Sequence, residues 1–72
     1  MKRILVADPI AQDGIDILAA EAEVDVKTGL KPEELAAIIG DYHALVVRSE
    51  TRVTAEIFAA AKQLQAVGRA GV

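Results

Sequence analysis

Two short, uninterrupted apolar segments limit the folds that this sequence can adopt. Residues 4–7 read Ile-Leu-Val-Ala and residues 44–47 read Ala-Leu-Val-Val, with no polar residue in either. A strand without alternation is covered on both faces, as in parallel sheets that carry helices on each side. Apolar residues at helical spacing follow both segments, which indicates crossover helices between parallel strands. The pattern predicts an α/β fold.

Three helices are expected between the strands. We expect Asp8 to cap the first, with Pro9 in its first helical position, where the missing N–H costs nothing. The second should open at residues 32–34, Pro-Glu-Glu, and Tyr42 should complete its apolar face with the hydroxyl in water. Thr54 is placed to cap the third helix. With the strands, this gives the order βαβαβαβ.

The two remaining strands differ from the central ones. Residues 23–27 alternate polar and apolar side chains, which is typical of a strand at the edge of a sheet, and residues 65–68 form a short, weak fourth strand. An edge-like second strand predicts the parallel order 2-1-3-4, the flavodoxin-like pattern. Because that fold also has a fifth strand and two more helices, we expect residues 1–72 to be a partial domain, incomplete at the C-terminus.

Composition excludes several classes of function. The net charge is −3 with a pI of about 4.9, and there is no Trp and no Lys/Arg run, which argues against a nucleic-acid partner. The absence of Cys excludes disulfides and thiol chemistry. The apolar segments are too short to span a bilayer or to serve as a signal peptide, so no membrane partner and a cytoplasmic location are expected.

Candidate binding residues follow the strands. In an open parallel sheet, ligands bind beyond the carboxyl ends of the strands, where this sequence places Arg48, Ser49 and Arg69. Two guanidinium groups and a hydroxyl suit a small anion such as a carboxylate or a phosphate. The alternative is that both arginines are solvated loop residues paired with Glu50 or Asp8.

Catalytic, cofactor and metal sites are not indicated by the residues themselves. His43 precedes the strand at 44–47, at the opposite end from the arginines, and is expected to be a surface or loop histidine. A signalling receiver domain, which also has an acid after its first strand, would need a phosphoacceptor carboxylate after the strand at 44–47. This sequence has Arg48 and Ser49 there, so that class is excluded. No glycine motif for a pyrophosphate is present. We therefore expect no catalytic, cofactor-binding or metal-binding residue in this chain.

Four segments carry a resemblance to a known family. They span nearly the whole chain and are ILVADPI at 4–10, VDVKTGL with PEEL at 24–35, ALVVRSETRVT at 44–54 and VGRAGV at 67–72. Through these segments the sequence resembles the D-isomer-specific 2-hydroxyacid dehydrogenases, and within them the branch that acts on D-3-phosphoglycerate.

The resemblance implies an activity and assigns site residues. Such enzymes oxidise 3-phosphoglycerate with NAD at the entry to serine biosynthesis, in a cleft between a substrate-binding domain and a Rossmann domain. It implies that Arg48, Ser49 and Arg69 face the phosphate or the carboxylate, and that backbone amides near Gly71 and Val72 approach the carboxylate. The family's catalytic residues and dinucleotide motif would follow Val72. We therefore expect residues 1–72 to be a catalytically silent part of the substrate-binding domain. The nucleotide-binding domain is absent from it, and NAD is expected to bind the parent enzyme but not this chain.

Two alternative functions stay open at this stage. The chain could be a stand-alone small-anion-binding or regulatory module, or an engineered flavodoxin-like fold fragment. In each case the strand at 65–68 would leave one backbone edge unpaired, so self-association through that edge is expected.

Overall fold

A computed structural model describes residues 2–48 and 51–69 and contains one parallel sheet with helices on both faces. The strand order is β2-β1-β3-β4, with every neighbouring pair parallel, which confirms the fold class and order expected from the sequence. Within the described ranges, no helix is long and apolar enough to cross a membrane. The elements are β1 (Arg3–Val6), α1 (Gln12–Ala19), β2 (Glu23–Val26), α2 (Pro32–Ile38), the 3-10 turn η1 (Ile39–Asp41), β3 (Ala44–Val47), α3 (Ala55–Ala60) and β4 (Ala66–Arg69).

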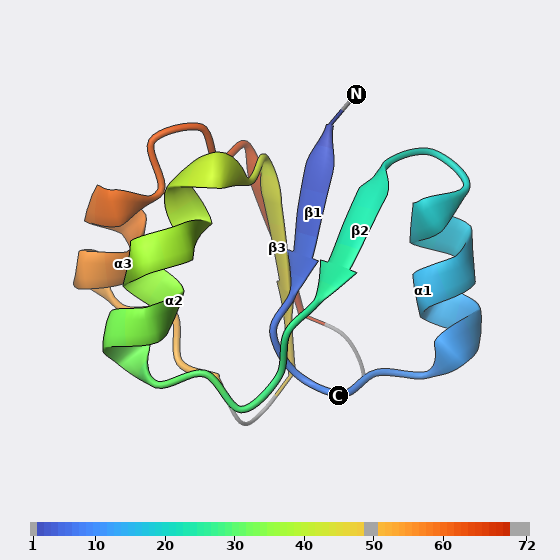
Figure 1. Ribbon diagram of the computed structural model, residues 1–72, viewed down its shortest axis with the longest axis horizontal. Helices are drawn as coiled ribbons and strands as arrows, with labels where there is room; N and C mark the ends of the chain where they lie inside the picture. The colour runs from blue at the N-terminus through green and yellow to red at the C-terminus, as the bar shows by residue number, and fades with distance from the viewer. Residues whose placement is uncertain (1, 49–50, 70–72) are drawn as a thin grey trace.

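The helices form two unequal layers around the sheet. α2 and α3 lie on one side and α1 on the other, next to β2 (Figure 1). Alternate residues of the central strands, such as Leu5 and Leu45, point into the α2/α3 layer, and both are fully buried. The main core therefore lies between the sheet and these two helices. Its buried members are Leu5, Ala7, Leu35, Ile39, Tyr42, Leu45, Val47, Ile57 and Ala61.

The start of the first helix differs from the expectation. α1 begins at Gln12 with Ala11 as its N-cap residue, and no side chain caps it. Asp8 and Pro9 therefore lie outside the helix, and their predicted roles as cap and first helical residue were wrong. The physical reason is that the Asp8 carboxylate accepts hydrogen bonds from the chain that follows β3, so it is not available to the amides of α1.

Tyr42 also differs from the expectation, because its hydroxyl is not in water. The residue is buried, and the hydroxyl donates to Asp25 Oδ2 at 2.7 Å. Arg3 Nη2 lies 3.1 Å from the same oxygen, and the Arg3 guanidinium stacks over the Tyr42 ring, 4.7 Å from its centroid. Burial, together with the bond to Asp25, raises the pKa of Tyr42 to about 12. The hydrogen bonds from Tyr42 and Arg3 lower the pKa of Asp25.

The remaining helix starts follow capping rules. Thr54 is the N-cap of α3 and its hydroxyl accepts from the Ile57 N–H at 3.4 Å, which confirms the predicted cap. In α2, Pro32 occupies the first turn and the Glu34 carboxylate accepts from the Lys31 N–H at 2.9 Å. These contacts fix where the chain leaves each loop, and α3 in particular starts directly after the loop that carries Arg48.

Candidate anion-binding site

The carboxyl ends of β3 and β4 border an open hollow of about 500 Å³. Val47 at the end of β3 pairs with Arg69 at the end of β4, so the two strands finish level with each other. The loop before α3 closes the third side. Basic and hydroxyl side chains alternate with apolar ones around the hollow, which is lined by Val47, Thr51, Arg52, Val53, Thr54, Val67 and Arg69.

The two arginines singled out from the sequence lie at the same rim of the sheet. Arg69 lines the hollow. Arg48 comes one residue after Val47, which is the strand partner of Arg69. The Arg48 side chain is exposed. It does not belong to the set of described residues that line the hollow. Its backbone N–H donates to Asp8 Oδ2 at 2.6 Å, which fixes the chain at that point.

Asp8 joins the ends of β1 and β3. Its side chain is 1% exposed, and Oδ2 also accepts the Thr51 N–H at 2.9 Å. The Thr51 hydroxyl donates to Oδ1, and it lies 3.4 Å from the Ala7 carbonyl oxygen. A buried carboxylate is tolerated when such donors satisfy it. Asp8 is therefore part of the scaffold beneath the loop that borders the hollow.

Three residues assigned by the resemblance, Ser49, Gly71 and Val72, lie outside the described residues. Glu50, the alternative partner for the arginines, also lies outside them. Of the five predicted substrate contacts, the described part of the chain contains Arg48 and Arg69, and both lie at the carboxyl ends of strands.

Arg52 is a basic residue of the hollow that our sequence reasoning did not single out. It lines the hollow beside Thr51 and Thr54. The available signal was its place in the loop at 48–53, three residues before a helix, where a third guanidinium group would face the same rim. With Arg69, it gives the hollow two positive charges that can form bidentate hydrogen bonds to an oxyanion.

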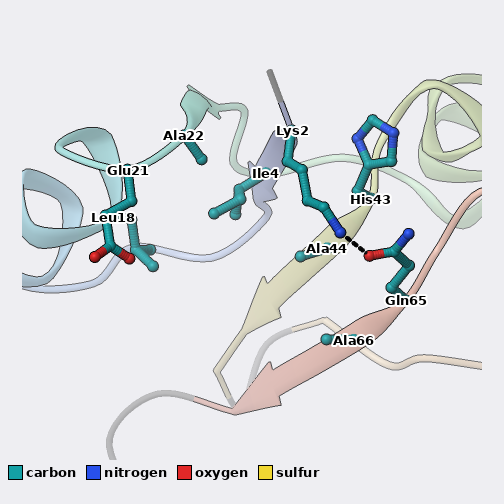
Figure 2. A pocket seen from close by; sticks show the side chains of 9 residues that line it. All are labelled: Lys2, Ile4, Leu18, Glu21, Ala22, His43, Ala44, Gln65 and Ala66. Atoms are coloured by element: carbon teal, nitrogen blue, oxygen red, sulfur yellow. Dashed lines mark hydrogen bonds between the residues drawn. The ribbon is translucent and has the colours of Figure 1, made fainter.

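A second hollow, of about 280 Å³, lies at the opposite end of the sheet on the α1 face (Figure 2). Ile4, Ala44 and Ala66 are paired across β1, β3 and β4 and form its floor, and Lys2 donates a hydrogen bond to Gln65 across it. His43 borders this hollow, in the loop before β3 as expected, and its Nδ1 accepts the Arg3 N–H at 3.0 Å. The histidine is therefore far from the arginine rim and serves to join β1 to that loop.

The side chains of the arginine rim have a chemistry that suits the binding of a small anion. Guanidinium groups remain charged at any physiological pH and donate hydrogen bonds, but they do not exchange protons readily. Across residues 2–48 and 51–69, no group of three His, Cys, Asp or Glu side chains could hold a metal ion. The rim thus offers positive charge and hydroxyl donors for a small anion.

The fold is a parallel α/β domain with a basic rim at the carboxyl ends of its strands, and comparisons with known proteins specify its family. The sequence profile of the D-isomer specific 2-hydroxyacid dehydrogenase catalytic domain matches residues 4–72. The chain therefore belongs to the D-isomer-specific 2-hydroxyacid dehydrogenase family.

Comparisons with individual proteins show relatives of the chain within this family. The chain is 51% identical over its whole length to a D-3-phosphoglycerate dehydrogenase of Synechocystis sp., of which it covers 13%. It is 49% identical over 97% of its length to a D-3-phosphoglycerate dehydrogenase of Archaeoglobus fulgidus, of which it covers 14%. A crystal structure of NAD+-bound 3-phosphoglycerate dehydrogenase from Entamoeba histolytica superposes on 99% of the chain with a TM-score of 0.82 and 25% identity, covering 26% of that protein. The chain thus spans about one seventh of the length of these curated relatives.

Proposed function

We propose that this chain is part of the substrate-binding domain of an NAD-dependent D-3-phosphoglycerate dehydrogenase that works in the cytoplasm. The observation that supports the proposal most is the combination of 51% identity to such an enzyme with a rim that brings Arg48 and Arg69 to the ends of adjacent strands. In this proposal the segment supplies contacts to the substrate anion, while catalytic groups and the NAD site belong to the remainder of the enzyme.

The chemistry of the substrate fits the charges of the rim. 3-Phosphoglycerate carries a carboxylate at one end and a phosphate at the other. In the proposal, Arg69 and Arg52 bind one anionic end from the hollow that they line, and Arg48, one residue past β3, is available to the other end. Ser49, Gly71 and Val72, which the resemblance also assigns to the substrate, complete the proposed contact set.

The test compares the intact dehydrogenase with residues 1–72 alone. The intact enzyme should reduce NAD when given 3-phosphoglycerate, and the 72-residue chain should show only background reduction, because it carries no catalytic or nucleotide-binding residue in our proposal. Absorbance of the reduced nicotinamide measures both. The assignment would be refuted if the 72-residue chain reduced NAD, or if the intact protein did not reduce NAD when given 3-phosphoglycerate.

Calorimetry separates this proposal from a stand-alone anion-binding module. For part of an enzyme whose site is completed by other residues, 3-phosphoglycerate should bind residues 1–72 only weakly, at about millimolar dissociation constants. Binding at about micromolar levels that is lost in Arg48→Ala would instead favour the module.

We further propose that residues 1–72 on their own self-associate through β4. All four residues of this edge strand are exposed, and Val67 and Phe58 leave 41% and 57% of their surfaces in solvent beside it. A second copy can pair with the free backbone edge and cover these side chains. Light scattering at about 100 µM should therefore give a dimer, and Val67→Lys, which places a charge on the edge, should give a monomer. A monomeric parent chain would contradict the proposal.

A further inference from the structure

The contact that connects β1 to the loop after β3 has a consequence for substrate recognition. Asp8 is 1% exposed and accepts the backbone N–H groups of Arg48 and Thr51, at 2.6 and 2.9 Å, on a single oxygen. Its other oxygen accepts the Thr51 hydroxyl. One carboxylate thus fastens the chain at two positions three residues apart.

Both positions belong to the loop that the proposed function uses. Arg48 is a proposed substrate contact, and Thr51 and Arg52 line the hollow with Arg69. Arg48 and Thr51 lie beyond β3, which ends at Val47. Their backbone N–H groups donate to the Asp8 carboxylate, and such charge-assisted bonds are stronger than bonds between neutral groups.

The charge of Asp8 argues against a direct role with the substrate. A carboxylate repels a phosphate or carboxylate ligand at close range, and this side chain is buried and already accepts from the Arg48 N–H, the Thr51 N–H and the Thr51 hydroxyl. Its contribution to an anion site must then be indirect. The alternative, a cap for α1, is excluded because Ala11 occupies that position.

We propose that Asp8 is a positioning residue for substrate binding, which holds the backbone at Arg48 and Thr51 so that the arginines of the loop meet the substrate anion. The inference rests on the proposed function, since it takes 3-phosphoglycerate as the ligand of the rim. It adds a residue from the first strand's end to a site otherwise built from β3, β4 and their loops.

The test uses the intact dehydrogenase and four variants: Asp8→Ala, Asp8→Asn, Arg48→Gln and the Asp8→Ala/Arg48→Gln double variant. Asp8→Ala should raise the KM for 3-phosphoglycerate about tenfold or more, because a displaced binding group loses most of its contribution, and should leave the KM for NAD unchanged. Asp8→Asn should restore most of the affinity, because the amide oxygen can still accept both backbone N–H groups and the Thr51 hydroxyl can accept from the amide nitrogen. Asp13→Asn removes the same charge at an exposed position and should change neither constant.

The double variant distinguishes positioning from a general loss of structure. If Asp8 acts through Arg48, Asp8→Ala should add less than about twofold to the effect of Arg48→Gln, whereas independent effects multiply. Multiplying effects, an equal rise in both KM values, or no effect of Asp8→Ala while Arg48→Gln weakens binding would each overturn the positioning role. An unchanged KM in Arg48→Gln would instead refute the arginine assignment on which the role depends.

Amide hydrogen exchange gives a readout that does not depend on activity. In Asp8→Ala, the amides of residues 48 and 51 should exchange at least about tenfold faster, while the Leu45 amide inside β3 stays protected. If Asp8→Ala does not fold, Thr51→Val takes its place, since it removes the hydroxyl donor to Oδ1 and leaves Asp8 intact. Unchanged exchange at both amides in a folded variant would contradict the proposal.

Discussion

Leu45→Ala should unfold most of the 72-residue chain or lower its melting temperature by at least about 8 °C. Leu45 is 0% exposed and lies on β3, which is paired on both sides, by β1 and by β4. Truncating a buried leucine costs about 2–5 kcal/mol, because it removes buried surface and leaves a cavity. A chain of this length has a total stability of only about 4–11 kcal/mol at about 0.05–0.15 kcal/mol per residue.

Ile17→Ala is the matched control for this substitution. It removes the same number of carbon atoms from α1, at a side chain that is 71% exposed. Its unfolding free energy should stay within about 0.5 kcal/mol of the parent. Thermal and urea unfolding followed by circular dichroism measure both variants. Equal losses in Leu45→Ala and Ile17→Ala would show that β3 is not the centre of the core.

The sheet could be derived from the sequence because strand burial leaves a direct pattern. Uninterrupted apolar runs at 4–7 and 44–47 distinguished the inner strands from the alternating run at 23–27, and this difference is enough to place β2 at the edge. The cap at Thr54 was equally local, since the side chain and the amide it accepts are three residues apart. Features that depend on neighbours in the chain were therefore predictable.

The roles of Asp8 and Tyr42 could not be derived in the same way. Asp8 accepts from residues 40 and 43 positions away, and Tyr42 donates to Asp25 on a different strand. Asp8 before Pro9 has the composition of a helix start, so local rules favoured a cap, although a distant loop competes successfully for the carboxylate. Polar contacts between loops depend on how the sheet is assembled, so they cannot be predicted from the local spacing of residues.

The arginine rim was predictable in part. Strand order alone brings Arg48 and Arg69 to the same edge, because the carboxyl ends of adjacent parallel strands lie together. The order does not say which side chains of the intervening loop line the hollow. Arg52 was missed for that reason, since its position depends on how the loop runs from β3 to α3.

Replacing both predicted arginines should abolish most substrate binding by the intact dehydrogenase. A hydrogen bond to a charged group is worth about 1.5–3 kcal/mol, so Arg48→Gln and Arg69→Gln should each weaken binding about 10–100-fold. Glutamine keeps a polar, though shorter, side chain and removes the charge. Lys62→Gln is the matched control, because it removes a positive charge from an exposed residue between α3 and β4, away from the rim.

The most direct measurement of the central claim is the dissociation constant of 3-phosphoglycerate, determined by calorimetry on the intact dehydrogenase and on the Arg48→Gln/Arg69→Gln variant. The account predicts that the double variant binds at least about 100-fold more weakly, that Lys62→Gln binds as the parent does, and that NAD affinity is the same in all three. A double variant that binds 3-phosphoglycerate as tightly as the parent, with its fold intact, would contradict the claim that this rim of the sheet recognises the substrate anion.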